Sequence, residues 1–197
     1  MRDEPERIGA IVLAGGRSTR FGRDKLAEPI GGRPMLERAI DAAGRVATDV
    51  VVVASPDGRP IVPAGAVLVR DHRAFEGPLA GLASGLTALE PAVERVIVVG
   101  GDMPTLVPTV LERLLDQVAA HDLAVLADDA GARPLPMALR RSRAWPVVDR
   151  LLAGGERRLR ALFSELDASV VEPSTWRADD PSGDTLRDVD VPEDLPG

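Results

Sequence analysis

The sequence contains no cysteine, which excludes a disulfide framework and a thiolate metal site. Aromatic residues make up only 3% of the chain, which argues against a stacking platform for single-stranded nucleic acid. The net charge of -7 also argues against general nucleic-acid binding, which depends on a basic surface. No apolar run approaches the roughly 20 residues of a membrane-spanning helix. We therefore expect neither a nucleic acid nor a membrane as a partner.

The length and the N-terminal composition indicate one intracellular domain. Residues 1–7 are polar and mixed in charge, without the apolar region of a secretory signal, and we expect a short disordered leader there. The remaining residues, 8–197, fit one domain that can bury a core. We expect a cytoplasmic protein.

Apolar runs alternate with segments of helical periodicity along the chain, which predicts an α/β fold. Predicted strands cover residues 8–12, 49–54, 67–69, 95–100, 123–127, 135–139 and 169–172. Predicted helices cover residues 35–47, 77–90, 108–121, 145–153 and 156–166, and residues 173–184 read as polar and flexible. The hydrophobic residues are mostly aliphatic, which suits buried parallel strands. We expect a single-domain, Rossmann-like, open mixed and mainly parallel sheet with helices on both faces.

A glycine-rich, basic loop follows the first predicted strand. Residues 13–25 read LAGGRSTRFGRDK, in which Gly15 and Gly16 allow a sharp turn and close approach of a ligand to the backbone. The loop also carries four cations in an acidic protein: Arg17, Arg20, Arg23 and Lys25. The spacing fits neither a Walker loop nor a dinucleotide fingerprint. A solvated basic loop is the simpler alternative, but the cations favour a polyphosphate ligand.

Three further segments are candidates for ligand binding. The segment Gly77-Pro78-Leu79-Ala80-Gly81 opens a helix, where free N–H groups can bind an anion, although a tight junction with small residues also explains it. Asp102 follows a buried strand and should face a cation or solvent, because an unpaired buried acid is costly. Asp188 and Asp190 share one face if their segment is extended.

A basic segment in the second half of the chain has two interpretations. Arg157, Arg158 and Arg160 could contact an anionic acceptor. A solvated helix face explains these arginines more simply.

Residues 13–25 closely resemble the L-A-G-G-x-S-x-R-x-G-x-D-K signature of the molybdenum cofactor guanylyltransferases, which belong to the nucleotidyltransferase superfamily. G-P-L-A-G at 77–81 and D-x-P at 102–104 resemble the second and third motifs of this family. Two positions depart from the pattern. Residues 188–192 read D-x-D-V-P where members often have N-x-N-T-P, and Ala54 stands where guanylyl members often have asparagine.

The resemblance implies transfer of GMP from GTP to the phosphate of molybdopterin, with release of pyrophosphate and Mg²⁺ as the cofactor. The implied catalytic residues are Arg20, Lys25 and Asp102. The implied nucleotide-binding residues are Leu13, Ala14, Gly15, Gly16, Lys25, Asp71, Gly77 and Asp102. The implied metal ligands are Asp102 and Asp190, with Asp188 as the alternative to Asp190. Transient contact with proteins of cofactor synthesis or with acceptor proteins is also implied.

Other activities remain open on the sequence. One is a nucleotidyltransferase for another base or acceptor, such as a molybdopterin cytidylyltransferase or a guanylyltransferase for another small phosphate. Another is a nucleotide-binding module that has lost turnover. Retention of Arg20, Lys25 and Asp102 together disfavours the module, because a binder has less need of a metal and a phosphate clamp combined.

Overall fold

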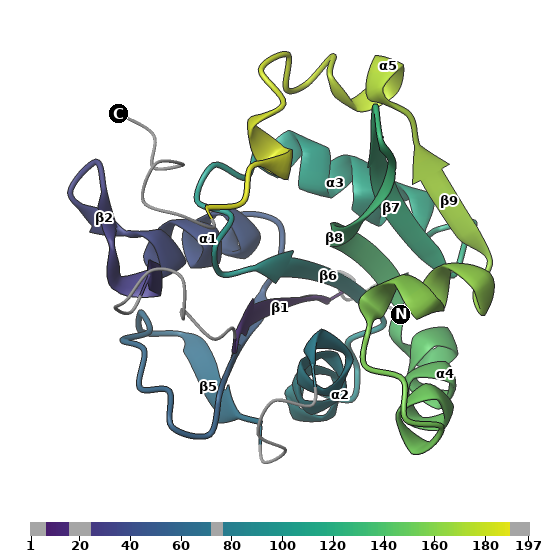
Figure 1. Ribbon diagram of the computed structural model, residues 1–197, viewed down its shortest axis with the longest axis horizontal. Helices are drawn as coiled ribbons and strands as arrows, with labels where there is room; N and C mark the ends of the chain where they lie inside the picture. The colour runs from purple at the N-terminus through teal and green to yellow at the C-terminus, as the bar shows by residue number, and fades with distance from the viewer. Residues whose placement is uncertain (1–6, 16–24, 72–76, 190–197) are drawn as a thin grey trace, which may run out of the picture.

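A computed structural model describes residues 7–15, 25–71 and 77–189, and within them a seven-stranded sheet forms the centre of the molecule (Figure 1). Its strands are β1 (Ile8–Ala14), β4 (Asp49–Ala54), β5 (Ala66–Arg70), β6 (Arg95–Gly100), β7 (Leu123–Asp128), β8 (Gly131–Arg140) and β9 (Ala168–Val171). They lie in the order β5-β4-β1-β6-β8-β7-β9. Residues 1–6 of the expected leader lie outside the described residues.

The strand directions confirm the expected mixed, mainly parallel sheet. β5, β4, β1 and β6 are mutually parallel. β8 runs antiparallel to both β6 and β7, and β7 is parallel to β9. The valine-rich β4 is covered on both faces, as is typical of parallel sheets.

Helices cover both faces of the sheet, as expected. One face carries α1 (Met35–Gly44), α3 (Pro108–Gln117) and α5 (Pro173–Trp176). The other carries α2 (Pro78–Ala88), α4 (Arg141–Ala153) and the 3-10 helix η2 (Leu159–Ser164), and Figure 1 shows α1 and α3 above the sheet and α2 and α4 below it. Alternate side chains of β1 supply both cores, because Ala10 and Val12 face α1 whereas Ile11 faces α2. Among the described residues, none of these helices is both long and apolar enough to span a membrane.

Several elements differ from their predicted extent; α4, for example, begins at Arg141 rather than at residue 145. In two places strand pairing overrides the local sequence signals. A hairpin of β2 (Pro29–Ile30) and β3 (Arg33–Pro34) forms in a segment for which no strand was predicted, with both turn glycines at positive φ. β8 spans ten residues instead of five, since pairing with β7 extends it back to the turn at 129–130. Pro134 and Pro136 lie between the two stretches of β8 that pair with β7, where the register is irregular.

The prediction of a flexible segment at 173–184 is wrong. This segment contains α5 and leads into the 3-10 helix η3 (Asp184–Leu186). Trp176 is only 1% exposed, and its indole N–H donates to the carbonyl of Ala127 at 2.8 Å. Asp180 is also buried and accepts hydrogen bonds from the backbone N–H groups of Thr185 and Asp184. The helix expected at 156–166 is likewise shorter and of 3-10 type.

Candidate functional site

The carboxyl ends of four parallel strands share one edge of the sheet. The backbone N–H of Gly101, just after β6, donates to the carbonyl of Leu13 at 2.9 Å. The N–H of Asp71, just after β5, donates to the carbonyl of Ala54 at 2.9 Å. These bonds continue the strand pairing past the ends of the strands, so Gly15, Asp71 and Asp102 follow neighbouring parallel strands at the same edge. Open α/β sheets bind ligands at this edge.

Lys25 and Asp102 form the central ion pair of this edge. The ammonium group of Lys25, at the start of the 3-10 helix η1 (Lys25–Ala27), lies 2.9 Å from Oδ2 of Asp102 and donates to the carbonyl of Val189 at 3.0 Å. The N–H of Val189 in turn donates to the carbonyl of Asp102 at 3.0 Å. The Lys25 side chain is 12% exposed and that of Asp102 is 31% exposed. The expectation that Asp102 faces a cation or solvent is therefore confirmed, and the cation is Lys25.

The two glycines before Asp102 lie in tight surroundings. A Cβ at Gly100 would lie 2.5 Å from Oδ1 of Asp102, and a Cβ at Gly101 would lie 3.0 Å from Leu36 and 3.3 Å from the carbonyl of Leu13. Gly15 differs, because a Cβ there would make only an ordinary contact with Ser55 at 3.6 Å. Among the described residues, therefore, none comes close enough to demand glycine at position 15.

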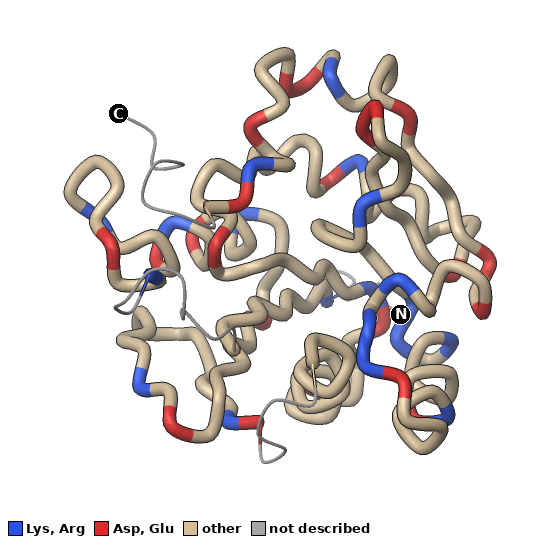
Figure 2. The backbone as a smooth tube through the Cα atoms, in the orientation of Figure 1, with Lys and Arg blue, Asp and Glu red and all other residues tan. Residues whose placement is uncertain are grey.

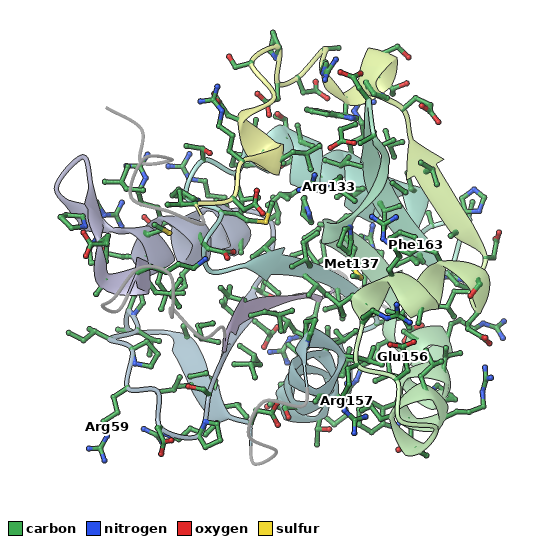
Figure 3. The ribbon with its side chains drawn as sticks, in the orientation of Figure 1. Arg59, Arg133, Met137, Glu156, Arg157 and Phe163 are labelled. Atoms are coloured by element: carbon green, nitrogen blue, oxygen red, sulfur yellow. The ribbon has the colours of Figure 1, made fainter. Side chains whose placement is uncertain are left out.

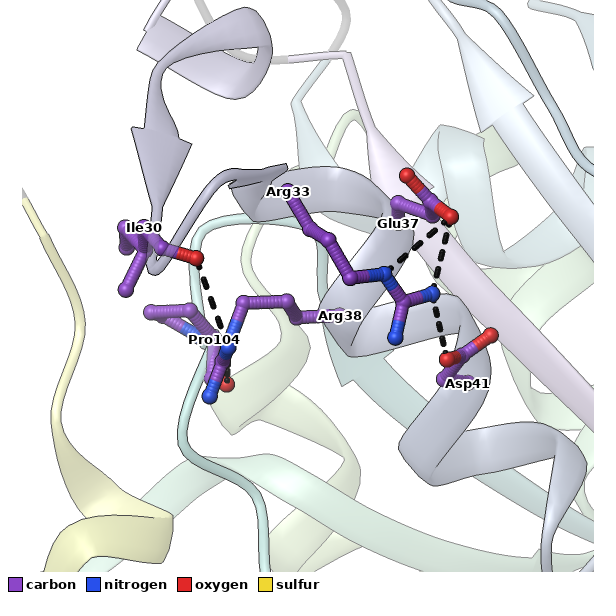
Figure 4. Close-up of polar contacts among 6 residues, drawn as sticks. All are labelled: Ile30, Arg33, Glu37, Arg38, Asp41 and Pro104. Atoms are coloured by element: carbon purple, nitrogen blue, oxygen red, sulfur yellow. Dashed lines mark hydrogen bonds and ion pairs between the residues drawn. The ribbon is translucent and has the colours of Figure 1, made fainter.

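Helix α1 holds the loop after Asp102 in place (Figure 4). The half-buried guanidinium of Arg38 donates to the carbonyl of Pro104 at 3.2 Å and to the carbonyl of Ile30 at 3.4 Å. Arg38 thus joins the Asp102 loop to the β2–β3 hairpin. Beside it, Glu37 and Asp41 accept hydrogen bonds from Arg33 and raise the pKa of its guanidinium. Sequence analysis missed Arg38, since its two partners are backbone carbonyls, which leave no signal in residue types.

The start of α2 differs from the expectation of free N–H groups. Gly77 adopts a φ of 87°, and a Cβ there would lie 2.8 Å from the carbonyl oxygen of Arg157. The N–H of Leu79 donates to that same carbonyl at 3.2 Å. The N–H groups of Ala80 and Gly81 both donate to the carbonyl of Gly77. The helix start is therefore already capped by a loop from the second half of the chain, and the role of Gly77 in nucleotide binding stays a prediction.

Asp71 lies at a cavity on the side of α2 away from the sheet. Its carboxylate accepts a hydrogen bond from the hydroxyl of Ser84 at 3.3 Å. The cavity has a volume of about 340 Å³, and it is lined by Asp71, Ala80, Ala83, Ser84, Thr87, Trp145, Asp149, Leu152 and Ala153. The role of Asp71 in contacting the base stays a prediction.

Several predicted residues are not placed by the structure. Gly16, Arg20 and Asp190 lie outside the described residues. Asp188 is described, and its carboxylate lies 3.9 Å from Arg133, which also pairs with Asp128 at 3.1 Å. Within the described ranges, no group of three or more His, Cys, Asp or Glu residues could hold a metal ion by itself.

Comparisons with known proteins agree with the motifs. The family model described as the MobA-like NTP transferase domain matches residues 10–170. The chain is 32% identical over 195 residues to a probable molybdenum cofactor guanylyltransferase from Chloroflexus aggregans, with 95% of this chain and 91% of the relative covered.

Solved structures share the fold. The molybdopterin-guanine dinucleotide biosynthesis protein A from Archaeoglobus fulgidus superposes with a TM-score of 0.77 at 22% identity, covering 95% of this chain and 94% of the other. A Mycobacterium tuberculosis protein in complex with manganese gives a TM-score of 0.64 at 18% identity, covering 84% and 88%. The family match and the relative confirm the resemblance seen in the motifs: this chain belongs to the MobA-like NTP transferase domain family.

Proposed function

We propose that this protein transfers GMP from GTP to the phosphate of molybdopterin and releases pyrophosphate. The observation that carries the proposal is the ion pair of Lys25 and Asp102, which joins the end of the glycine-rich loop to the end of β6. The relatives named molybdenum cofactor guanylyltransferases supply the choice of donor and acceptor. In the cell we expect the reaction in the cytoplasm, with transient contact to proteins that make or receive the cofactor.

The chemistry needs positioning and charge neutralisation more than a protein nucleophile. A phosphate oxygen of the acceptor attacks the α-phosphorus of GTP. The bond from this phosphorus to the oxygen that bridges to the β-phosphorus breaks, and pyrophosphate leaves with the electron pair. The backbone of Leu13, Ala14, Gly15 and Gly16 would bind the nucleotide, and Lys25 would neutralise charge that develops on the phosphates. Arg20 is the proposed second phosphate contact.

The described residues fit a Mg²⁺ ion that is held partly by the substrate. Mg²⁺ in such sites commonly takes one or two carboxylates and completes its shell with phosphate oxygens and water. Asp102 supplies a partly exposed carboxylate at the strand edge. Bound there, Mg²⁺ would polarise the phosphate and offset its developing charge. Because Asp188 faces Arg133, we assign the second ligand to Asp190 rather than to Asp188.

Lys25 also has a role before substrate binds. Its ammonium neutralises the Asp102 carboxylate, so the negative charge is compensated when neither metal nor nucleotide is present. On binding, phosphate oxygens offer Lys25 a second set of acceptors. Lys25 also donates to the carbonyl of Val189, just before Asp190. A move of the Lys25 ammonium from Asp102 to the phosphates would therefore affect the segment that precedes Asp190.

A second candidate is transfer of another nucleotide. The observation that favours it is Ala54, which is fully buried at the end of β4 and offers no side-chain hydrogen bond to a base. If the protein does use GTP, recognition of guanine must come from Asp71 and the loop backbone instead of from position 54.

The proposed reaction is tested by incubating the purified protein with GTP, Mg²⁺ and molybdopterin. We expect pyrophosphate in equal amount to an acceptor whose mass has increased by one GMP, and neither product when the acceptor is omitted. Pyrophosphate without the acceptor adduct, or an unchanged acceptor, would contradict the proposal.

A further inference from the structure

A loop from the second half of the chain closes over the start of α2. This loop, residues 154–158, joins α4 to η2, and Figure 3 shows Glu156 and Arg157 between α2 and α4. The carbonyl of Arg157 accepts the N–H of Leu79 at 3.2 Å. The same carbonyl lies where a side chain at Gly77 would have to be. The loop therefore contacts the backbone at the start of α2 and leaves no room for a side chain at Gly77.

The Glu156 carboxylate holds the loop in this conformation. Its Oε1 accepts the backbone N–H groups of Arg157 at 2.8 Å and Arg158 at 2.9 Å. The guanidinium of Arg158 donates to Oε1 through Nε and to Oε2 through a terminal nitrogen, both at 3.0 Å. The backbone N–H of Glu156 also donates to the carbonyl of Leu151 at 3.0 Å, which anchors the loop to the end of α4.

The arginines of this loop are therefore engaged within the loop. Figure 2 shows basic residues gathered on the segment between α4 and η2. The guanidinium of Arg158 pairs with Glu156, and that of Arg157 donates to the carbonyl of Glu156 at 3.0 Å. An acceptor anion would have to compete with these contacts. The structure points instead to the carboxylate and the carbonyl as the groups that matter here.

A shift of the α2 start would reach the glycine-rich loop. Close contacts join α2 to β1, because a Cβ at Gly81 would lie 3.3 Å from Leu13 and a Cβ at Gly85 would lie 2.6 Å from Ile11. Well-packed interiors transmit such displacements, since they leave little free volume. The position of α2 thus bears on Gly77 and on the side chain of Leu13, the first residue of the glycine-rich loop.

We propose that Glu156 is a positioning residue for nucleotide binding, which acts through the carbonyl of Arg157 on Gly77 and the start of α2. This inference rests on the proposed function, because it takes Gly77 and Leu13 as nucleotide-binding residues.

The test compares Glu156→Gln with the matched control Glu165→Gln. Glu165 pairs with the side chain of Arg150 at 2.8 Å on the same face of the molecule, so both variants remove one carboxylate from one arginine. Hydrogen exchange at the Leu79 amide, measured without nucleotide, reports on the contact itself. KM for GTP and kcat report on its consequence, and Tm reports on general stability.

We expect Glu156→Gln to speed exchange of the Leu79 amide by roughly fivefold or more. KM for GTP should rise roughly 3- to 10-fold with kcat changed less than about twofold, because lost positioning of a binding group weakens binding rather than chemistry. Glu165→Gln should match the wild type in Leu79 exchange and in KM for GTP. Arg158→Gln removes only the guanidinium donors to Glu156, and it should also speed Leu79 exchange and raise KM for GTP. This variant replaces Glu156→Gln in the test if Glu156→Gln does not fold.

Two results would overturn the proposal. Unchanged Leu79 exchange in Glu156→Gln would show that the carboxylate does not hold the contact. Faster exchange with an unchanged KM would show that the contact does not govern nucleotide binding. Failure of the proposed function is distinguishable, because the wild-type protein itself would then show no GTP turnover while the exchange comparison still reports on the contact.

Discussion

Lys25 is the single lysine of the sequence, and its ammonium joins three segments that are far apart in the chain. It bonds Asp102 after β6 and the carbonyl of Val189 near the C-terminus. The sequence predicted that Asp102 would face a cation or solvent, but it did not identify Lys25 as that cation. The contact with Val189 was not predictable, since a backbone carbonyl leaves no signal in residue types.

Lys25→Ala should lower kcat/KM by about 10²–10³-fold, because it removes a fixed cation from the phosphates in the transition state. Steady-state kinetics with GTP and molybdopterin measure the loss. Arg59→Ala is the control, since this exposed arginine points away from the molecule in Figure 3. A folded Lys25→Ala variant with the activity of Arg59→Ala would contradict the assignment.

Asp102→Asn should lower activity and shift the Mg²⁺ titration to higher concentration, because a neutral amide binds Mg²⁺ less well than a carboxylate. Asp188→Asn is the matched control, because Asp188 faces Arg133. It should leave the Mg²⁺ titration close to that of the wild type. Equal titrations for the wild type and Asp102→Asn would exclude Asp102 as the metal ligand.

The pH dependence of stability should reveal the contacts of Glu156. Hydrogen bonds from Arg158, followed by those from the backbone of Arg158 and Arg157, lower the pKa of Glu156 from 4.5 to about 2. Because the folded-state pKa is the lower one, its contribution to stability is present above pH 4.5 and is lost as the pH falls towards about 2. Urea unfolding should therefore show wild type more stable than Glu156→Gln at neutral pH, with a difference that shrinks below pH 4.5. A pH-independent difference would contradict this cause of the shift.

At the scale of elements, the sequence predicted best where a segment's own pattern decides its structure. The valine run of β4 is buried by its neighbours on both faces, and its predicted bounds are confirmed. The length of β8, in contrast, depends on its pairing with β7. Residues 173–186 form a defined structure because Trp176 is buried and donates to the carbonyl of Ala127. The polar residues around Trp176 led to the prediction of a flexible segment, because a single tertiary contact leaves no local pattern.

The close approach of α2 to β1 makes a prediction about two glycines of one helix. Helix propensity alone would make replacement of either glycine by alanine stabilising by about 1 kcal/mol. At Gly85 the new Cβ would lie 2.6 Å from Ile11, whereas at Gly81 the nearest atom is 3.3 Å away. Gly85→Ala should therefore lower the free energy of unfolding by about 1–2 kcal/mol relative to Gly81→Ala, because overpacking commonly costs about 1–3 kcal/mol. Urea unfolding of the two variants measures the difference, and equal stabilities would contradict the close packing.

At the scale of the whole molecule, the strand order explains which parts of the site could be predicted. Strands β5, β4, β1 and β6 are neighbours and parallel, so residues that follow them meet at one edge. This rule places Gly15, Asp71 and Asp102, which each follow one of these strands, at the same edge. It could not predict contacts between halves of the chain, such as that of Leu79 with Arg157, because these depend on how α4 and η2 pack below the sheet.

Selectivity for the base tests the central claim most directly. The protein is incubated with Mg²⁺, molybdopterin and equal concentrations of GTP, CTP and ATP, and the dinucleotide products are identified by mass. A site whose polar groups pair with guanine leaves them unpaired with other bases, so kcat/KM for GTP should exceed that for CTP and ATP by at least roughly 10²-fold. The account therefore predicts the guanine dinucleotide as the dominant product. Similar amounts of the three products, or a dominant cytosine product, would contradict it.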